Sequence, residues 1–355
     1  MAFERATPPR PFDVTAVFPE LAPLARAAIR LHPRAGMPSV RDSSVGGPLL
    51  WPAEESWPHC ESAQHQDTGF REYPAAVRLE RRRLARLRRD PGGPAYTPEE
   101  SAINERNDAA LEERLHADPP PAECPVPMLP VAQLFVRDVP LLRPPGQADV
   151  LQVLWCPYDH EPDAKPSTAL FWRCEAEVGD VLAVPPQPYE ADWGGCYVPE
   201  PCLLAPEQIT EYPNSLDLSA ELRQLVGDWS RWQATEVGVD GLCADYPQEF
   251  YDSALADAPG WKVGGWPPWG RTDPIPRFCA ICDARMVPLL TIASFEWDGG
   301  SGSWIPYEDQ ATASAGRGAG QSPTQPTAVQ VGSTDNMQLY VCPASPEHPH
   351  TDLIQ

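Results

Sequence analysis

Four residues in the C-terminal part of the chain have the types and the spacing of a metal site. Cys279 and Cys282 are separated by two residues, which allows both thiolates of one tight turn to bind the same Zn²⁺. Tetrahedral zinc takes four ligands, and Cys342, followed six residues later by His348, supplies the other two. We therefore predict a structural zinc site formed by these four residues.

Other interpretations of the Cys-x-x-Cys pair stay open at this point. The pair can be a redox site, although thioredoxin-like pairs lie at a strand-to-helix junction, whereas Pro288 and an apolar strand follow here. It can also be a turn that contains two small apolar side chains. His350 or a water molecule could take the place of His348 in the ligand set.

The first half of the chain contains a corresponding set of residues. Cys60 and Cys124 lie on either side of a long charged insertion, and Cys156 is followed four residues later by His160. If the insertion projects from the turn that separates Cys60 from Cys124, the two cysteines still meet in space. The sequence then predicts a second zinc site, and the alternative is that these four residues are unrelated.

Tryptophans beside two Gly-Gly pairs are candidates for a ligand-binding groove. Trp51 and Trp57 follow the first pair, and Trp266 and Trp269 follow the second. Flat aromatic rings next to bare backbone can contact a flat ligand or a sugar closely. The alternative is that these rings pack against proline in tight turns and bury apolar area.

No constellation of catalytic residues is apparent in the sequence. It contains no Gly-x-Ser-x-Gly motif, P-loop, His-Glu-x-x-His motif or dinucleotide-binding fingerprint. The run Asp159-His160-Glu161 specifies no partner nucleophile, so it does not indicate acid–base chemistry. We predict no catalytic residues.

An internal repeat indicates which elements position the predicted ligands. Three blocks recur in the same order: 46–52 with 264–269, 124–138 with 282–296, and 152–157 with 338–343. In the second block, Cys, Met, Pro, an aliphatic residue and an acidic residue recur at identical spacing. Two copies of this length predict a duplicated domain with mostly antiparallel sheet halves, residues 1–212 and 213–355.

Helices and loops are expected around these halves. Apolar spacing predicts a helix over residues 19–31. Residues 61–123 predict a helical hairpin, since an arginine-rich segment is followed by Pro-Gly-Gly-Pro and by a capping box at Thr97 with Pro98 at the first helical position. The arginines can dock on the acidic half of the protein or face solvent. Residues 311–327 are rich in Gly, Ser, Thr and Pro and predict a flexible loop.

Charge and composition limit the kinds of partner. The 355 residues carry a net charge of −23, and residues 144–355 alone hold 9 Lys+Arg against 30 Asp+Glu, a balance of −21. Such a surface repels phosphate backbones and anionic lipids, so we predict a basic partner or simple solubility, and no nucleic acid or membrane. With no apolar run of membrane-spanning length and no secretory signal, the ten cysteines predict a reducing, cytoplasmic location.

The repeated blocks resemble the YwqG-like domain family. The resemblance rests on Gly46-Gly47-Pro48 with Trp51-Pro52, on residues 262–267, and on the strand that ends in Glu296-Trp297-Asp298. It implies an internally duplicated α+β fold from bacteria, with no established activity and no catalytic residues to carry over. The family's strand pattern Leu-Leu-Gln-Ile-Asp reads here as Pro-Val-Ala-Gln-Leu and Leu-Leu-Thr-Ile-Ala.

Together these observations predict a non-catalytic, cytoplasmic binding protein with one or two structural zinc sites. Two alternatives belong to other classes of function. One is an enzyme that acts on a small ligand in a groove between the halves. The other is an immunity-like or antitoxin-like protein whose acidic half covers a basic partner.

Overall fold

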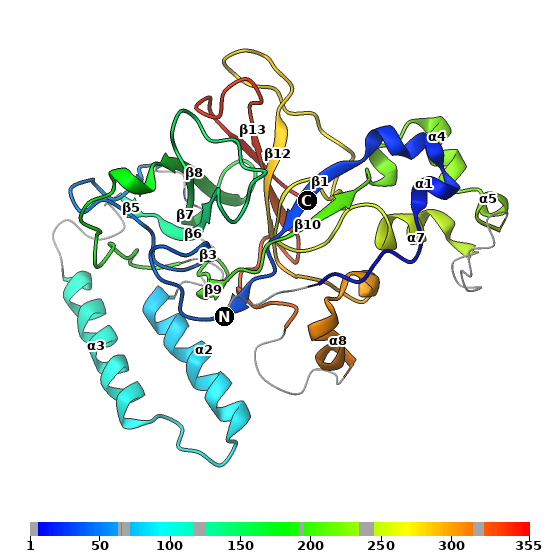
Figure 1. The fold of residues 1–355 in the computed structure, drawn as a ribbon. Coiled ribbons are helices and arrows are strands. Elements are labelled where there is room, and N and C mark those ends of the chain that lie inside the picture. The colour runs from blue at the N-terminus through cyan, green and yellow to red at the C-terminus, as the bar shows by residue number, and fades with distance from the viewer. Residues whose placement is uncertain are drawn as a thin grey trace.

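Two six-stranded antiparallel sheets lie at the centre of the protein (Figure 1). The computed structural model describes residues 6–62, 65, 72–116, 125–191, 195–233, 245–314 and 323–355. The first sheet has the order β10 (Glu207–Glu211), β1 (Arg26–Arg30), β11 (Lys262–Gly264), β12 (Val287–Ala293), β13 (Asn336–Val341) and β14 (Thr351–Ile354). The second has the order β2 (Arg34–Ala35), β9 (Cys202–Leu203), β3 (Ser44–Val45), β6 (Leu129–Phe135), β7 (Val150–His160) and β8 (Lys165–Arg173). A separate ribbon pairs β4 (His59–Cys60) with β5 (Val126–Pro127).

Helices lie around the sheets, which confirms the predicted α+β class. One group packs together at one end of the molecule, with its own apolar cluster around Phe18 and Trp232. This group consists of α1 (Val14–Val17), η1 (Pro19–Leu24), η5 (Ser215–Asp217), α4 (Ala220–Val226), α5 (Trp229–Gln233) and α7 (Pro247–Ala254). The other helices are α2 (Pro74–Arg89), α3 (Pro98–Leu115), η3 (Glu175–Glu177), η6 (Gly302–Trp304) and α8 (Tyr307–Ser314). None of the helices in the described ranges is both long and apolar enough to cross a bilayer.

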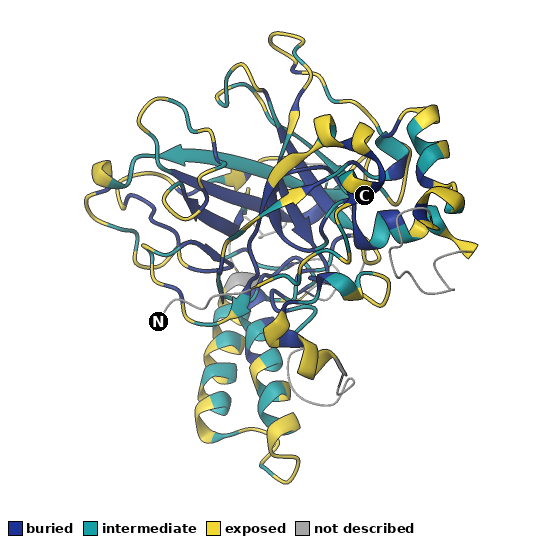
Figure 2. Ribbon diagram, turned by 45° about the vertical axis from the view of Figure 1, so that its right-hand side comes forward, coloured by how far each residue is buried: buried dark blue, intermediate teal, exposed yellow. Residues whose placement is uncertain are grey.

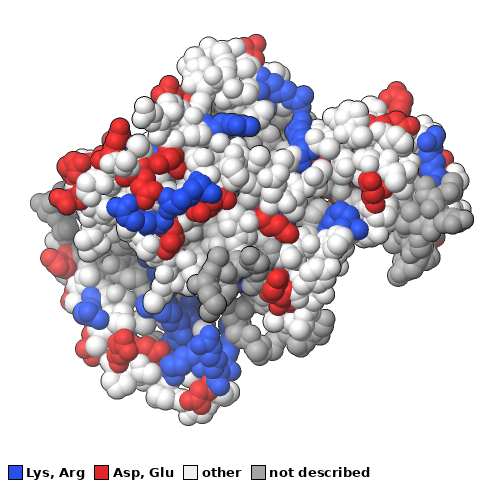
Figure 3. Space-filling model, viewed as in Figure 1, with Lys and Arg blue, Asp and Glu red and all other residues white. Residues whose placement is uncertain are grey.

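Helices α2 and α3 form the hairpin predicted within residues 61–123, and it projects away from the sheets (Figures 1 and 2). The capping box is present, since the Glu100 backbone N–H donates to Thr97 Oγ1 at 3.2 Å and the Thr97 N–H donates to Glu100 Oε2 at 2.8 Å. Basic side chains gather on this hairpin (Figure 3). Some of its arginines are used internally: Arg86 pairs with Glu100 across the hairpin, and Arg81 donates to the carbonyls of Val198 and Gly195.

Two sequence-based predictions of local structure are wrong. Residues 19–31 are not one helix, because the 3₁₀-helix η1 is followed by strand β1, and the buried residues that looked helical belong to two elements. Residues 311–314 lie in α8 rather than in a loop. At the other end of the predicted loop, Thr327 is buried and its carbonyl accepts from the Glu200 N–H at 2.7 Å; residues 315–322 lie outside the described ranges.

One antiparallel ribbon runs through both sheets. In the first sheet Arg30 of β1 pairs with Glu207 of β10, and in the second Arg34 of β2 pairs with Leu203 of β9 in the same register. The Ala205 N–H donates to the Leu31 carbonyl at 2.9 Å between these two stretches. Strands β1 and β10 therefore lie in the sheet built from second-half strands, and the boundary near residue 212 stays a prediction.

The apolar core lies between the sheets and contains side chains of both. Leu129, Val153 and Trp155 come from the second sheet, whereas Leu290 and Leu339 come from the first. All five are essentially inaccessible to solvent, and Figure 2 shows the strands of both sheets as the most buried part of the molecule. The sheets therefore form one packed unit.

The repeated blocks occupy matching positions in the two sheets. Strand β6 pairs with β7, and β12 pairs with β13, and each pairing has an irregularity just after its proline, Pro130 or Pro288. Gln152 and Gln338 stand at the same position relative to these irregularities. This match supports the predicted duplication of the hairpins, and the duplication of the complete halves stays a prediction.

A buried group of charged side chains lies at the end of the ribbon formed by β1 and β10. Glu211 accepts from Lys262 Nζ at 2.8 Å and from the backbone N–H groups of Ala258 and Trp266. A Cβ atom on Gly265 would lie 2.2 Å from a Glu211 oxygen, so this turn needs glycine at that place. Asp257 also lies 3.9 Å from Lys262, so two carboxylates share one ammonium group.

The Asp257 carboxyl makes stability dependent on pH. Its burial raises its pKa to about 7, and the charge of Glu211 adds to the rise against the opposing charge of Lys262. Between the usual value of 3.8 and about 7, the folded protein holds a proton that the unfolded chain has released. The free energy of unfolding therefore falls as the pH rises from about 4 to about 7 and stops changing above that.

The free energy of unfolding of Asp257→Asn, relative to that of the native protein, should therefore increase by about 2–3 kcal/mol from pH 5 to pH 8. Urea unfolding at the two pH values measures this difference. Asp273→Asn, at an exposed aspartate, is the matched control and should show no such gain. A difference for Asp257→Asn that is the same at both pH values would contradict the raised pKa.

Candidate metal centres

The second-half cluster brings together the four residues predicted from the sequence. The sulfur of Cys279 lies 3.3 Å from His348 Nδ1, and the sulfurs of Cys282 and Cys342 lie 3.4 Å apart. All four ligand atoms lie within 4.8 Å of one another. Because two sulfurs bound to one zinc at about 2.3 Å stand about 3.8 Å apart, this cluster is compatible with a tetrahedral ion.

A tight turn positions the first two ligands of this cluster. The chain forms a narrow ribbon in which Phe278 pairs with Arg285, and the Asp283 N–H donates to the Cys279 carbonyl. Asp283, directly after Cys282, takes a left-handed conformation with a φ of 55° at the end of this turn. The Ile281 N–H points at the Cys279 sulfur at 3.4 Å. The turn thereby places Cys279 beside His348, and Cys282 beside Cys342, which directly follows β13.

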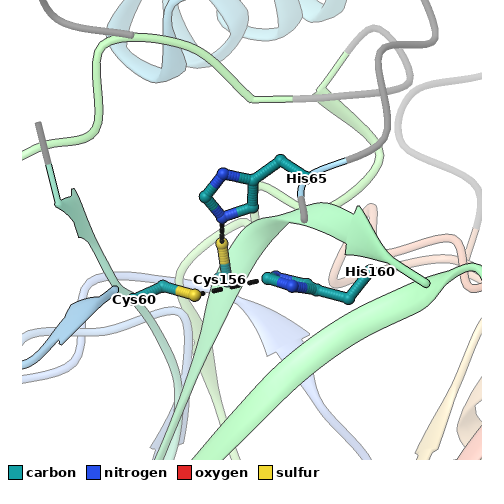
Figure 4. Close-up of side chains that lie close together, drawn as sticks. All are labelled: Cys60, His65, Cys156 and His160. Carbon is teal, nitrogen blue, oxygen red and sulfur yellow. Dashed lines mark hydrogen bonds between the residues drawn. The ribbon is translucent and has the colours of Figure 1, made fainter. Parts of the chain in front are cut away.

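The first-half cluster consists of two cysteines and two histidines. Cys60 lies 3.7 Å from His160 Nε2, and Cys156 lies 3.4 Å from His65 Nε2. The four ligand atoms again lie within 4.8 Å of one another, and Figure 4 shows the side chains pointing toward a common centre. Strands β4 and β7 supply Cys60, Cys156 and His160, and a bridge between His65 and His160 places the fourth residue.

His65 is the ligand that the sequence analysis missed. It lies five residues after Cys60, inside the charged insertion, and the second half has no residue that corresponds to it. Cys124, predicted for this cluster, lies outside the described residues. The one available signal was the Cys-x₄-His spacing, which resembles the Cys-x₃-His spacing of Cys156 and His160.

The two clusters occupy corresponding places in the fold. Cys156 directly follows the β7 residue that pairs with Leu129, at the start of β6. In the same way, Cys342 directly follows the β13 residue that pairs with Val287, at the start of β12. Cys60 lies on β4, opposite Val126, in the same way that Cys279 lies opposite Ala284. Each cluster also packs against the repeated methionine, Met128 in one and Met286 in the other.

The surroundings lower the pKa of three ligand thiols, Cys60, Cys279 and Cys342, and raise the pKa of the other two, Cys156 and Cys282. Hydrogen bonds with the Cys156 thiol, and to a smaller extent with His160 and His65, lower the pKa of Cys60 to about 2. Burial raises the pKa of Cys156. In the second cluster, burial acts to raise the pKa of Cys342, but backbone N–H groups of Ser345 and Ala344 outweigh it and lower that pKa. Both clusters can therefore hold a metal ion.

The tryptophans predicted to line a ligand groove make internal contacts. Trp51 and Trp57 are buried and pack against each other with ring centroids 5.1 Å apart. The Trp266 indole donates to the Leu24 carbonyl, and the Trp269 indole donates to Asp217. None of these four tryptophans lines either of the two surface hollows described below. Their role in ligand binding stays a prediction.

The described surface includes two hollows that differ in size and lining. The larger, with a volume of about 440 Å³, is lined by first-half residues that include Trp172 and Glu177, and by Glu347 from the loop that carries His348. The smaller, of about 300 Å³, lies beside Phe12 and Tyr212. Neither contains the Asp159-His160-Glu161 run, in which Asp159 accepts from the Tyr197 hydroxyl and His160 belongs to the first cluster.

No family model matches the chain, and no curated protein is similar enough to it in sequence to count as a match. The resemblance to the YwqG-like family therefore stays a prediction.

The ligand set of the first cluster can be tested by substitution. His65→Ala should weaken cobalt binding at this cluster by at least about tenfold, because it removes one of four ligand atoms. Cys124→Ala should leave the affinity unchanged. Cobalt titration followed by the thiolate-to-cobalt absorption measures both.

His59→Ala is the matched control, since His59 is exposed and adjoins Cys60 without belonging to the cluster. Loss of cobalt binding in Cys124→Ala, with His65→Ala unaffected, would replace His65 by Cys124 in the ligand set.

Proposed function

We propose that the protein is a non-catalytic, cytoplasmic binding protein of the YwqG-like type, stabilised by two structural zinc ions. The observation that carries this proposal is that each of two clusters supplies four S and N ligand atoms within 4.8 Å. Sulfur and imidazole ligands in sets of four are typical of structural zinc. A catalytic zinc keeps one coordination position open for water, and a full set of four protein ligands leaves none.

The state of the cysteines agrees with this proposal. The eight cysteines that the structure describes are free thiols, and five of them lie in the two clusters. Thiols of this kind persist in a reducing compartment, which supports the cytoplasmic location.

Zinc would cross-link segments that bury little apolar surface. Most residues between Arg271 and Asp283 are exposed, so few apolar contacts hold this turn against β13. In the first half, one ion would join β4 to the end of β7 and to the insertion at His65. Structural zinc contributes on the order of 10 kcal/mol of apparent binding free energy in small zinc peptides, so the local effect here should be large.

Zinc analysis of the purified protein tests the proposal. We expect two zinc ions per chain, and one in Cys342→Ala, because that substitution removes a ligand of the second cluster. Cys202→Ala is the matched control: Cys202 is as buried as Cys342 but lies outside both clusters, so this variant should keep two ions.

Removal of zinc by a chelator should also lower the melting temperature of the native protein by several degrees. A native protein that is purified without chelator and contains no zinc would overturn the proposal.

The residues that line the larger hollow favour a positively charged binding partner. Glu177 and Glu347 line it from the two halves, and Trp172 offers an aromatic wall to a cation. Arg173, which also lines it, is neutralised by a bidentate pair with Glu55 at 2.6 and 2.7 Å. The negative charge of residues 144–355 would attract such a partner over a longer range.

A lysine-rich peptide is a suitable probe for this hollow. The double variant Glu177→Gln with Glu347→Gln should bind it about fivefold more weakly, since two exposed charge pairs contribute about 1 kcal/mol together. Isothermal titration at low salt measures the affinity. Glu54→Gln with Glu99→Gln, at exposed sites outside the hollow, keeps the same net charge, and an equal loss in this control would rule out the hollow as the site.

A further inference from the structure

The two clusters differ in the exposure of their cysteine residues. Cys60 and Cys156 of the first cluster are 8% and 0% exposed, and they share an apolar cluster with Trp51 and Trp57. In the second cluster Cys279 and Cys342 are each 2% exposed, whereas Cys282 lies in the exposed turn that also contains Ala280 and Ile281. A small reagent in solution therefore reaches one ligand thiol far more easily than the other four.

Exposure and thiolate character together decide which cysteines react with oxidants. A thiol that coordinates a metal is deprotonated, so zinc would keep Cys282 in the nucleophilic form. Its sulfur also has a second sulfur within reach, because Cys342 Sγ lies 3.4 Å away. Cys279 is buried, and its sulfur lies 3.3 Å from His348 Nδ1. The geometry thus pairs one accessible thiolate with one buried resolving thiolate.

We propose that Cys282 is a peroxide-reactive cysteine, and that its oxidation links it to Cys342 and releases the zinc ion of the second cluster. This inference rests on the proposed zinc sites. It adds a modification site to them and makes the second site a reversible, oxidant-sensitive one, while the first stays closed to the same reagent.

The reaction has two displacement steps. The Cys282 sulfur attacks one oxygen of hydrogen peroxide, the O–O bond breaks, and hydroxide leaves, so that Cys282 becomes a sulfenic acid. The Cys342 sulfur then attacks the Cys282 sulfur and displaces the second hydroxide, which forms the disulfide. The two hydroxides take up two protons and become water. Two electrons pass from the thiolates to peroxide, and zinc leaves as Zn²⁺ with two of its four ligands removed.

The first cluster lacks the features that this chemistry needs. Its sulfurs are buried beneath Trp57 and Met128, with neither thiol in an exposed turn. Two of its four ligand atoms are imidazole nitrogens, which peroxide does not convert to a disulfide. Its zinc should remain bound while the second zinc is lost.

The experiment treats the full-length zinc-loaded protein with hydrogen peroxide and follows released zinc with a colorimetric chelator. Zinc is counted before treatment, and disulfides are mapped afterwards by alkylation, proteolysis and mass spectrometry. Oxidation of Met37, which is 95% exposed, reports that peroxide has reacted with the protein. We expect release of one of two zinc ions, a Cys282–Cys342 disulfide, and restoration by a thiol reductant with added zinc.

Cys282→His is the informative variant, because it keeps four zinc ligands and removes the exposed thiol. Its zinc release should be at least about tenfold slower than that of the native protein. Release at the native rate from this variant would overturn the proposal, as would equal loss of both ions or a disulfide between other cysteines. Full zinc loading with no release after Met37 is oxidised would overturn this inference alone. Absence of zinc before peroxide is added would overturn the proposed function as well.

Discussion

The antiparallel pairing of residues 26–35 with residues 202–211 is the constraint on which the rest of the structure depends. It keeps one register through both sheets, from the Arg30–Glu207 pair to the pair between Ala35 and Cys202. Strand β11 pairs with this ribbon in one sheet and β3 does so in the other. The hairpin β6–β7 pairs with β3, and the hairpin β12–β13 pairs with β11. The ribbon therefore fixes the positions of both metal-ligand clusters relative to each other.

Buried polar groups complete this frame at the points where apolar packing ends. Glu211, at the end of the ribbon, is satisfied by one ammonium and two backbone N–H groups, which offsets the cost of taking its charge out of water. The cysteine and histidine clusters lie in comparable places, at turns that bury little apolar surface. In each case specific polar partners, rather than buried apolar surface area, determine where the chain lies.

The same framework supports two clusters with different chemistry. Corresponding strands place Cys156 within β7 and Cys342 directly after β13. One cluster is completed by His65 from the insertion, and the other by Cys282 from a short exposed turn. The insertion therefore changes the ligand set to two sulfurs and two nitrogens, and the surrounding tryptophans cover it. In our proposal one site is a closed cross-link, and the other is a cross-link that peroxide can open.

Short-range spacing determined much of this protein from its sequence alone. The Cys-x₂-Cys turn, the matched positions of Cys156 and Cys342 and the capping box at Thr97 depend on residues close in the chain, and such local geometry can be deduced from sequence. Only the tertiary structure decided the rest. Residues 26–30 form a strand because β10 and β11 pair with them, and His65 joins the first cluster because the insertion returns to β7. Both outcomes depend on partners far away in the sequence, and no local pattern records such partners.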